Sequence, residues 1–198
     1  MIKVNSIAFA YKHQPLFKNL CFQLTEGQVL QVIGSNGSGK TTLLKILAGL
    51  LEPMEGNVDW ESEKSLLYLG HKIGIKNCLT IKENLLASKL YGRWRKNILL
   101  EQVLIQLKLE KLINSLCSHI SEGQRRRVAL ARLLLLEAKV WILDEPFAAI
   151  DQAGIDLLIE LISNHLKQKG IAIFTSHQWI NLSQIPITKI FLASHAAG

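Results

Sequence analysis

Short apolar runs separated by polar, glycine-containing turns fill the first third of the chain, a pattern that predicts β-strands. The runs are Ile2–Tyr11, Leu16–Leu24, Val29–Ile33, Asn57–Trp60 and Leu66–Leu69. Between the third and fourth of these, leucines and an isoleucine recur at helical spacing over Thr42–Ala48. We therefore expect a strand, a glycine-rich connection and a helix to follow one another over residues 29–48.

Apolar residues recur every three or four positions in the middle of the chain, which predicts a helical insert over residues 80–118. These apolar positions are Leu85, Leu86, Leu90, Ile98, Leu99, Val103, Leu104, Leu107 and Leu112. A further helix is expected from about Glu122 to Leu136.

The last third of the chain contains three apolar runs without alternation, Val140–Leu143, Ile171–Phe174 and Ile190–Leu192. Uninterrupted runs of this length are typical of parallel strands that are covered on both faces. A helix is expected over Ala153–Lys169, between the first two runs. Strands alternating with helices predict an α/β fold with a parallel sheet.

The segment Gly34-Ser-Asn-Gly-Ser-Gly39-Lys40-Thr41 lies between a predicted strand and a predicted helix and fits the pattern G-x-x-x-x-G-K-[ST]. Its glycines allow the backbone N–H groups to surround a phosphate, beside a helix N-terminus that carries partial positive charge. We expect Lys40 to reach the β- and γ-phosphates of a nucleotide and the Thr41 hydroxyl to hold Mg²⁺. The other reading, a chance glycine-rich turn, does not explain the flanking strand and helix. The predicted nucleotide-binding residues are Gly34, Ser35, Asn36, Gly37, Ser38, Gly39, Lys40, Thr41 and Thr42.

The strand Val140–Leu143 ends in Asp144-Glu145-Pro146. Two carboxylates then lie at the carboxyl edge of the sheet, where α/β proteins bind their ligands. We expect Asp144 to hold Mg²⁺ through water and Glu145 to act as the general base for an attacking water. An Asp-Glu pair can also stand at the start of a helix without any catalytic role. The phosphate-binding loop elsewhere in the chain makes the catalytic interpretation the favoured one.

Composition and charge narrow the class of protein further. The chain has 198 residues, 48% of them apolar, and a net charge of +7. No stretch is long and apolar enough to cross a bilayer, and the N-terminus lacks the apolar core of a signal peptide. The basic clusters Arg93–Lys96 and Arg125–Arg127 are interpreted as solvated helix faces, not as a nucleic-acid or membrane surface. Because Cys21, Cys78 and Cys117 lack metal-site spacing, we expect reduced thiols in a cytosolic protein.

The segment Ile120-Ser-Glu-Gly-Gln124 resembles the signature loop of ATP-binding-cassette (ABC) ATPases, which usually reads Leu-Ser-Gly-Gly-Gln. Two further matches follow in the family's order. Ala148-Ala-Ile-Asp151 resembles the loop after the magnesium carboxylates, and His177 resembles the switch histidine that contacts the γ-phosphate. Taken alone, a histidine after a strand would more readily be a surface or capping residue.

This resemblance covers essentially the whole chain and implies one domain over residues 1–198. Its P-loop NTPase core has a parallel sheet, joined by an antiparallel β subdomain and a helical subdomain at about residues 72–122. ATP and Mg²⁺ are the implied cofactors, and ATP hydrolysis is the implied reaction. The implied catalytic residues are Glu145, His177 and Lys40.

The resemblance also implies a head-to-tail homodimer that forms with ATP. The residues that would contact nucleotide across this dimer are Ser121, Gly123, Gln124 and Asp151. Tyr11 corresponds to the aromatic residue that stacks on adenine. Phe9 competes for that role, and an exposed tyrosine at a strand end is the plain alternative.

Two segments, residues 68–84 and 141–151, are similar to the ATP-binding subunits of bacterial haem exporters in cytochrome c maturation. This resemblance implies a peripheral subunit on the cytoplasmic face of the bacterial inner membrane. Its partners would be separate transmembrane haem-exporter subunits and no nucleic acid. ATP hydrolysis would drive haem export or release of a haem-loaded chaperone. The alternative is the ATPase subunit of another ABC exporter with a different cargo.

The chain departs from the family pattern at two positions. Lys72, beside His71, replaces the glutamine that links Mg²⁺ to the membrane partner. An ammonium group cannot ligate a cation, so that contact is lost, rearranged or made by His71. Glu122 replaces a small residue of the signature loop. Its carboxylate either points away, toward Arg125 or Arg126, or weakens closure of the dimer.

Other classes of cassette protein fit less well. Cassette ATPases of chromosome maintenance carry a long coiled coil between the P-loop and the signature loop, but only 79 residues separate Thr41 from Ser121 here. Translation-associated cassette proteins usually carry two cassettes in tandem, and this chain has one. An ATP-gated module without hydrolysis would not need the combination of Lys40, Asp144, Glu145 and His177.

Overall fold

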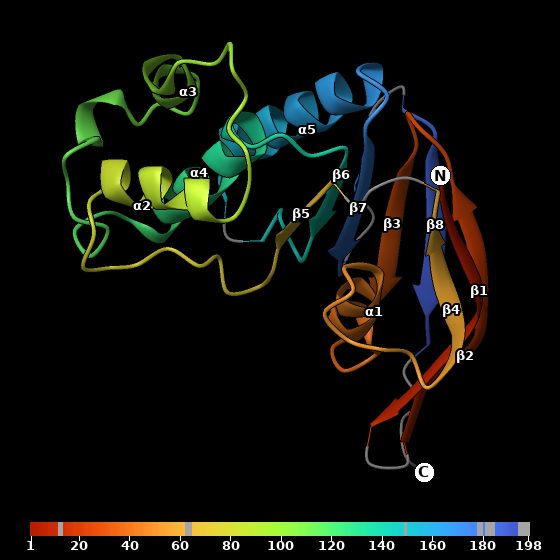
Figure 1. The fold of residues 1–198 in the computed structure, drawn as a ribbon. Coiled ribbons are helices and arrows are strands. Elements are labelled where there is room, and N and C mark those ends of the chain that lie inside the picture. Colours follow the sequence, from red (N-terminus) through yellow and green to blue (C-terminus); the bar gives the residue numbers. More distant parts are fainter. Residues whose placement is uncertain (12–13, 62–64, 149, 178–179, 181–184, 194–198) are drawn as a thin grey trace. The chain divides into compact units, whose positions relative to one another are not determined.

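In the computed structural model, the described residues are 1–11, 14–61, 65–148, 150–177, 180 and 185–193 (Figure 1). The chain divides into two compact units. The first contains Met1–His71, Lys139–Pro146 and Ile159–Gly198, and the second contains Lys72–Ala138 and Phe147–Leu158. The second unit therefore begins at the start of the predicted helical subdomain and includes more of the chain than residues 72–122.

A five-stranded parallel sheet lies in the first unit, in the order β5-β6-β7-β3-β8. Its strands are β3 (Val29–Gly34), β5 (Leu66–Leu69), β6 (Val140–Leu143), β7 (Ile171–Ser176) and β8 (Ile187–Leu192). All four pairs of neighbouring strands are parallel, as the apolar runs predict. Strands β6 and β7 are buried at every position.

The prediction that the last strand is covered on both faces is wrong. Strand β8 forms an edge of the sheet and pairs only with β3 among the described strands. Three of its residues are exposed, including Phe191, whose exposed fraction is 72%. A short apolar run does not by itself distinguish a central strand from an edge strand, because both contain apolar residues.

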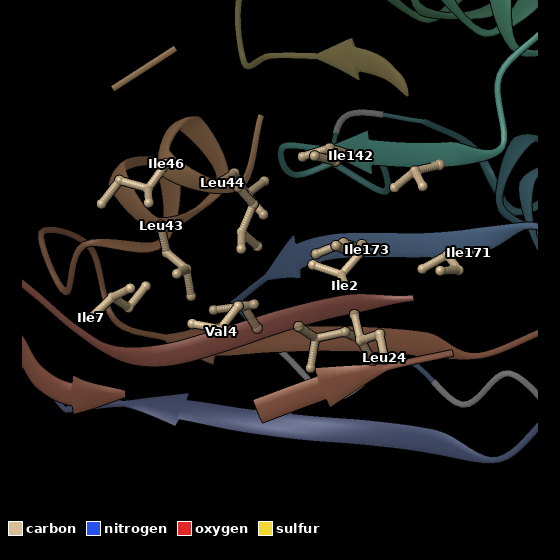
Figure 2. Close-up of a cluster of buried hydrophobic side chains, with 14 of the residues drawn as sticks. Ile2, Val4, Ile7, Leu24, Leu43, Leu44, Ile46, Ile142, Ile171 and Ile173 are labelled. Carbon is tan, nitrogen blue, oxygen red and sulfur yellow. The ribbon is translucent and has the colours of Figure 1, made fainter. Parts of the chain in front are cut away.

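The first unit also contains a three-stranded antiparallel sheet in the order β2-β1-β4. Its strands are β1 (Ile2–Tyr11), β2 (Gln14–Leu24) and β4 (Glu55–Trp60). A cluster of buried apolar side chains joins this sheet to the parallel sheet and to helix α1 (Lys40–Leu47). Figure 2 shows side chains of β1, α1, β6 and β7 meeting in this core. Burial on both sides fixes the start of α1 next to the ends of β6 and β7.

The second unit is helical and is made of several separate helices and 3₁₀ turns. It contains α2 (Ile81–Ala87), the 3₁₀ turns η1 (Ser88–Leu90) and η2 (Glu110–Leu112), α3 (Leu100–Gln106), α4 (Glu122–Leu135) and the first part of α5 (Gln152–Lys167). The predicted apolar periodicity is confirmed only in part: Leu85, Val103, Leu104 and Leu107 are buried, whereas Leu86, Leu90 and Leu99 are exposed. No helix within the described part of the chain is long and apolar enough to span a membrane.

Candidate nucleotide-binding and hydrolysis site

The loop between β3 and α1 requires glycine at Gly37, whose φ is +80°, and at two further positions where the loop meets the neighbouring elements. Gly39, directly before α1, has a φ of +95°, which L side chains rarely adopt. A Cβ atom on Gly34 would lie 2.3 Å from Ser38 Oγ and 2.7 Å from the Leu192 carbonyl oxygen. These two positions allow the loop to fold tightly between the end of β3 and the start of α1.

The ammonium group of Lys40 lies inside this loop. Only 6% of Lys40 is exposed, and Nζ donates hydrogen bonds to the carbonyl oxygens of Gly34 (2.8 Å) and Ser35 (3.1 Å). Glu145 Oε1 lies 3.9 Å from the same nitrogen. A buried cation is stable only where acceptors surround it, and here two carbonyl oxygens and one carboxylate do so.

Two further observations fit a phosphate group at this loop. The Ser38 hydroxyl is buried and has no hydrogen-bond partner among the residues that the structure describes. Helix α1 begins without a side-chain cap and without an acidic residue in its first turn. Uncapped N–H groups and a positive helix end both favour an anion at this position. The loop therefore fits the phosphates of a nucleotide.

Asp144 accepts a hydrogen bond on each carboxylate oxygen. Thr41 Oγ1 donates to Oδ2 at 2.8 Å, and Thr175 Oγ1 donates to Oδ1 at 2.8 Å. The structure thus brings together Thr41 and Asp144, the two residues that the sequence predicts to hold Mg²⁺. A hydroxyl and a carboxylate are oxygen donors of the kind that Mg²⁺ prefers, so this pair fits the cation.

Glu145 has an unusual backbone conformation, with φ of +52°. Its N–H donates to Thr175 Oγ1 at 2.8 Å. Its side-chain Oε1 lies 2.7 Å from His177 Nε2, in addition to the longer contact with Lys40. The first unit therefore assembles the three residues predicted to be catalytic around the carboxylate of Glu145.

Sequence reasoning did not identify Thr175 as part of this site. Thr175 is fully buried in β7, two residues before His177. A hydroxyl inside an otherwise apolar strand was the available signal, because such a group needs a hydrogen-bond partner. Its partners are the side chain of Asp144 and the backbone of Glu145.

Tyr68 lies close enough to Asp144 for the two to interact electrostatically. Burial, and secondly the negative charge of Asp144, raise the pKa of the Tyr68 phenol to about 12. Both causes disfavour a phenolate next to the carboxylate. Tyr68 therefore remains neutral at physiological pH and adds no charge beside Asp144.

The two candidate adenine-stacking residues differ in exposure. Tyr11 is 64% exposed at the end of β1, where it pairs with Gln14 of β2. Phe9 is partly buried and packs against the hydrophobic core of the first unit. The exposed ring of Tyr11 leaves it the better candidate, and its role stays a prediction.

In the second unit, Ser121 is the N-cap of helix α4. Its hydroxyl accepts from Gln124 N at 3.2 Å, while Gln124 Oε1 accepts from Ser121 N at 2.9 Å. This capping box satisfies two backbone N–H groups. A Cβ atom on Gly123 would meet nothing within 4 Å among the described residues, so packing inside the chain does not require glycine there. An open backbone position of this kind suits close approach of another molecule.

The carboxylate of Glu122 takes the ion-paired arrangement. Glu122 Oε2 lies 3.4 Å from Arg125 Nη2, one helical turn further along α4. Arg125 Nη1 also donates to Asn77 Oδ1 at 3.3 Å, which holds the guanidinium group in place. Of the two outcomes expected for Glu122, the structure shows the one in which Arg125 neutralises its charge.

Because Glu122 is paired, we expect Glu122→Gly to leave ATP-dependent dimerisation unchanged when it is introduced together with Glu145→Gln. The dimer fraction over an ATP titration, measured by size-exclusion chromatography, checks this. A clear rise in that fraction would mean that the carboxylate opposes closure. Repulsion between the Glu122 carboxylate and the γ-phosphate, and not the ion pair with Arg125, would then determine the effect of Glu122 on dimerisation.

Asp151 forms an ion pair with Arg127 of α4 in which one guanidinium nitrogen contacts both carboxylate oxygens. Arg127 Nη2 lies 2.9 Å from both carboxylate oxygens, and Gly154 N donates to Oδ1 at 3.1 Å. The hydrogen bond from Arg127, and secondly that from Gly154, lower the pKa of the Asp151 carboxyl group. Asp151 is therefore ionised at neutral pH. Ala149, which belongs to the segment Ala148–Asp151 that resembles the family's loop, lies outside the described residues.

The site residues thus divide between the units. Within the first unit the structure brings together Lys40, Thr41, Asp144, Glu145 and His177. The second unit carries the N-terminus of α4 with Ser121, and the pair formed by Arg127 and Asp151.

Comparison with known proteins agrees with this geometry. The family model for ABC transporters matches residues 17–148. The cytochrome c biogenesis ATP-binding export protein CcmA of Escherichia coli O157:H7 is 40% identical over 207 residues, covering 100% of this chain and 99% of that protein. CcmA of Shigella flexneri is 39% identical over 208 residues with the same coverage.

A solved structure shares the fold. It is that of a Pyrococcus furiosus protein assigned as an ABC transporter ATP-binding protein. It aligns with a TM-score of 0.80 and 26% identity and covers 96% of each chain. The family model and the relatives that align over the full length agree with the P-loop site seen in the structure. The chain therefore belongs to the ABC transporter family as an ABC ATPase.

Proposed function

We propose that this chain hydrolyses ATP as the motor subunit of an export complex in bacterial cytochrome c biogenesis. The observation that carries the catalytic part is the contact of Glu145 Oε1 with His177 Nε2 and Lys40 Nζ, beside the Asp144–Thr41 pair. A base, a histidine, a phosphate-binding cation and a magnesium carboxylate then share one site. Each group has a separate role in the reaction.

The loop binds and orients the phosphates. Lys40 would exchange its bonds to the loop carbonyls for the more negative β- and γ-phosphate oxygens, which form stronger charge-assisted hydrogen bonds. Ser38 Oγ and the N–H groups at the start of α1 would add neutral donors. Several donors on a rigid loop hold the γ-phosphorus in position for attack from one side.

Thr41 and Asp144 would hold Mg²⁺, with Asp144 acting through water. The cation supplies neutralisation of charge on the β- and γ-phosphate oxygens when it is bound. The hydrogen bond from Thr175 to Asp144 Oδ1 leaves Oδ2 directed toward Thr41. The protein therefore orients the carboxylate before any cation binds.

Glu145 would take a proton from water as the water oxygen attacks the γ-phosphorus. The bond between that phosphorus and the bridging oxygen breaks, and its electron pair remains on ADP. His177 Nε2 lies 2.7 Å from Glu145 Oε1 and would hold that carboxylate in one orientation. With ATP bound, His177 would turn and donate to a γ-phosphate oxygen. A positioned base of this kind contributes about 10²–10⁴-fold to a rate.

A second copy of the chain would complete the site. The N-terminus of α4, a helix of 14 residues, presents Ser121 and the open backbone at Gly123. A helix N-terminus stabilises an anion, so it suits the γ-phosphate bound by the partner's P-loop. Two ATP molecules would then lie between two copies arranged head to tail.

Placement in cytochrome c biogenesis is supported by the CcmA relatives, which match over the full chain. The partners would be separate transmembrane haem-exporter subunits, and the chain would lie on the cytoplasmic face of the inner membrane. Hydrolysis would drive haem export or release of a haem-loaded chaperone.

The segment Lys72–Glu83 is our candidate docking surface for the membrane subunit. The buried side chain of Asn84 fixes part of it, since Oδ1 accepts from Lys76 N at 2.8 Å and Nδ2 donates to the carbonyl oxygens of Lys76 and Thr80, each at 3.0 Å. Lys76 and Lys82 are exposed on this fixed backbone. Their side chains are therefore available to an acidic partner.

We expect Lys76→Glu combined with Lys82→Glu to reduce co-purification of the membrane subunit while ATP affinity stays at the wild-type value. Detergent extraction, affinity capture and mass spectrometry of the captured proteins measure this. The matched control reverses two exposed lysines of the antiparallel sheet, Lys3→Glu and Lys18→Glu. Unchanged recovery in the first variant, or equal loss in both variants, would contradict this docking surface.

A further inference from the structure

Thr175 connects the two acidic residues of the site through one hydroxyl group. We propose that it is a positioning residue, which fixes Asp144 through the aspartate side chain and Glu145 through the glutamate backbone. This inference rests on the proposed hydrolytic function. It assigns to β7 a role in the reaction that is separate from its role in the core.

The direction of each hydrogen bond is determined. A threonine hydroxyl has one proton to donate and can accept at its oxygen. Glu145 N–H can only donate, so at 2.8 Å it uses the oxygen as acceptor. The single hydroxyl proton then points to Asp144 Oδ1, also at 2.8 Å, which must accept it. Because Thr175 is fully buried, water does not compete for either bond.

The hydroxyl replaces a backbone acceptor where the sheet ladder stops. The parallel pairing of β6 with β7 ends at Leu143 and Phe174. Strand β7 continues to Thr175 and Ser176, which still pair with β3 on the other side but have no partner in β6. The chain after β6 leaves the sheet, and the side chain of Thr175 accepts the hydrogen bond from Glu145 N.

This bond coincides with the unusual conformation of Glu145. A positive φ is rare for a residue with a side chain and persists only where its surroundings enforce it. The bond to Thr175 anchors the amide of Glu145 at this turn, and the carboxylate then lies 2.7 Å from His177 Nε2. Loss of the hydroxyl should therefore let the base change its orientation.

Asp144 is held from two sides, and the two sides have different roles. Thr41 Oγ1 binds Oδ2 from the phosphate-binding loop, and Thr175 Oγ1 binds Oδ1 from the sheet. Thr41 is a predicted magnesium ligand, so its hydroxyl would turn toward the cation. Thr175 would then be the hydroxyl that keeps Asp144 in the orientation that the cation needs.

Thr175→Val tests the proposal, because valine keeps the branched shape and removes the hydroxyl. It leaves Asp144 Oδ1 and Glu145 N–H buried without this partner. We expect kcat to fall by about tenfold or more, KM for ATP to change by less than about threefold, and Mn²⁺ affinity in the presence of a non-hydrolysable ATP analogue to fall by about tenfold. Paramagnetic resonance measures bound Mn²⁺ without turnover.

Two further variants separate positioning from stability. Thr175→Ser keeps the hydroxyl and should restore both kcat and Mn²⁺ affinity to nearly the wild-type values. Ser176→Ala removes the neighbouring buried hydroxyl, which accepts a hydrogen bond from Gln31, and should leave Mn²⁺ affinity unchanged. If Thr175→Val does not fold, Thr175→Ala carries the same expectation.

Wild-type kcat and Mn²⁺ affinity in the valine or alanine variant would overturn the proposal. A serine variant as impaired as the valine variant would also overturn it, because the methyl group and not the hydroxyl would then matter. Failure of the proposed function looks different. In that case the wild-type protein would not hydrolyse ATP, or Glu145→Gln would hydrolyse it at the wild-type rate.

Discussion

Glu145→Gln is expected to retain ATP binding and to lower the rate of ATP hydrolysis by about 10²–10⁴-fold. Glutamine has nearly the same shape, and its amide oxygen can still accept from His177 Nε2, which lies 2.7 Å from Oε1 in the wild-type chain. An amide cannot take a proton from water at neutral pH. Phosphate release and ATP binding, measured on the same preparation, separate the two effects.

The same variant should accumulate an ATP-bound dimer that the wild type forms only transiently. Size-exclusion chromatography with ATP and Mg²⁺ measures the dimer fraction. Glu160→Gln, an exposed position of α5, is the matched control and should behave as wild type. Undiminished hydrolysis in Glu145→Gln would remove Glu145 from its role as the base.

Lys40→Ala is expected to weaken ATP binding as well as hydrolysis. Lys40 is the cation inside the loop, and charged hydrogen bonds of this kind contribute about 1.5–3 kcal/mol each, or about 10–150-fold in affinity. Calorimetric titration with ATP measures the loss. Lys45→Ala, an exposed lysine in the last turn of α1, should bind ATP with wild-type affinity.

Equal ATP affinity in Lys40→Ala and in the wild type would contradict the assignment of this loop. A thermal unfolding curve for each variant is the necessary control, because Lys40 also bonds the carbonyl oxygens of Gly34 and Ser35. If binding is lost while the melting temperature is retained, the missing contact is one to the nucleotide.

The parts of the site that could be predicted lie where sequence pattern and backbone position coincide. The position of Lys40 and Thr41 is predicted from a strand, a glycine-rich loop and a helix that follow one another. The position of Asp144 is predicted from an apolar strand that ends in acidic residues. Parallel strands end at a common edge of a sheet, so proximity of Thr41 and Asp144 could be expected although they lie 103 positions apart in the sequence. In the structure the two side chains are joined by a hydrogen bond of 2.8 Å, and their role as magnesium ligands stays a prediction.

The remaining features depend on tertiary neighbours that no local pattern encodes. Strand β8 lies at the edge of the sheet and has three exposed residues, and an apolar run reveals neither feature. The hydroxyl of Thr175 in a buried strand signals only that it needs a hydrogen-bond partner, and the sequence does not show that its partners are Asp144 and Glu145 N. The pairing of Arg127 with Asp151 likewise joins residues 24 positions apart.

The departures from the family pattern have different outcomes. The structure resolves the orientation of Glu122, because Arg125 one turn later holds its carboxylate. It leaves the replacement of the magnesium-linked glutamine by Lys72 as a prediction. Lys72 is exposed, and the segment after it is fixed by Arg132, whose guanidinium donates to the carbonyl oxygens of Ile73 (3.0 Å) and Gly74 (2.9 Å).

Phosphate release by the membrane complex captured through a tag on this chain tests the central claim most directly. The complex is assayed with ATP, with and without Mg²⁺, beside the same complex carrying Glu145→Gln. We expect magnesium-dependent release by the wild-type complex and a loss of about 100-fold or more in the variant. Equal release by the two complexes, or none from the wild-type complex while it binds ATP, would contradict the assignment of the chain as the ATP-hydrolysing subunit.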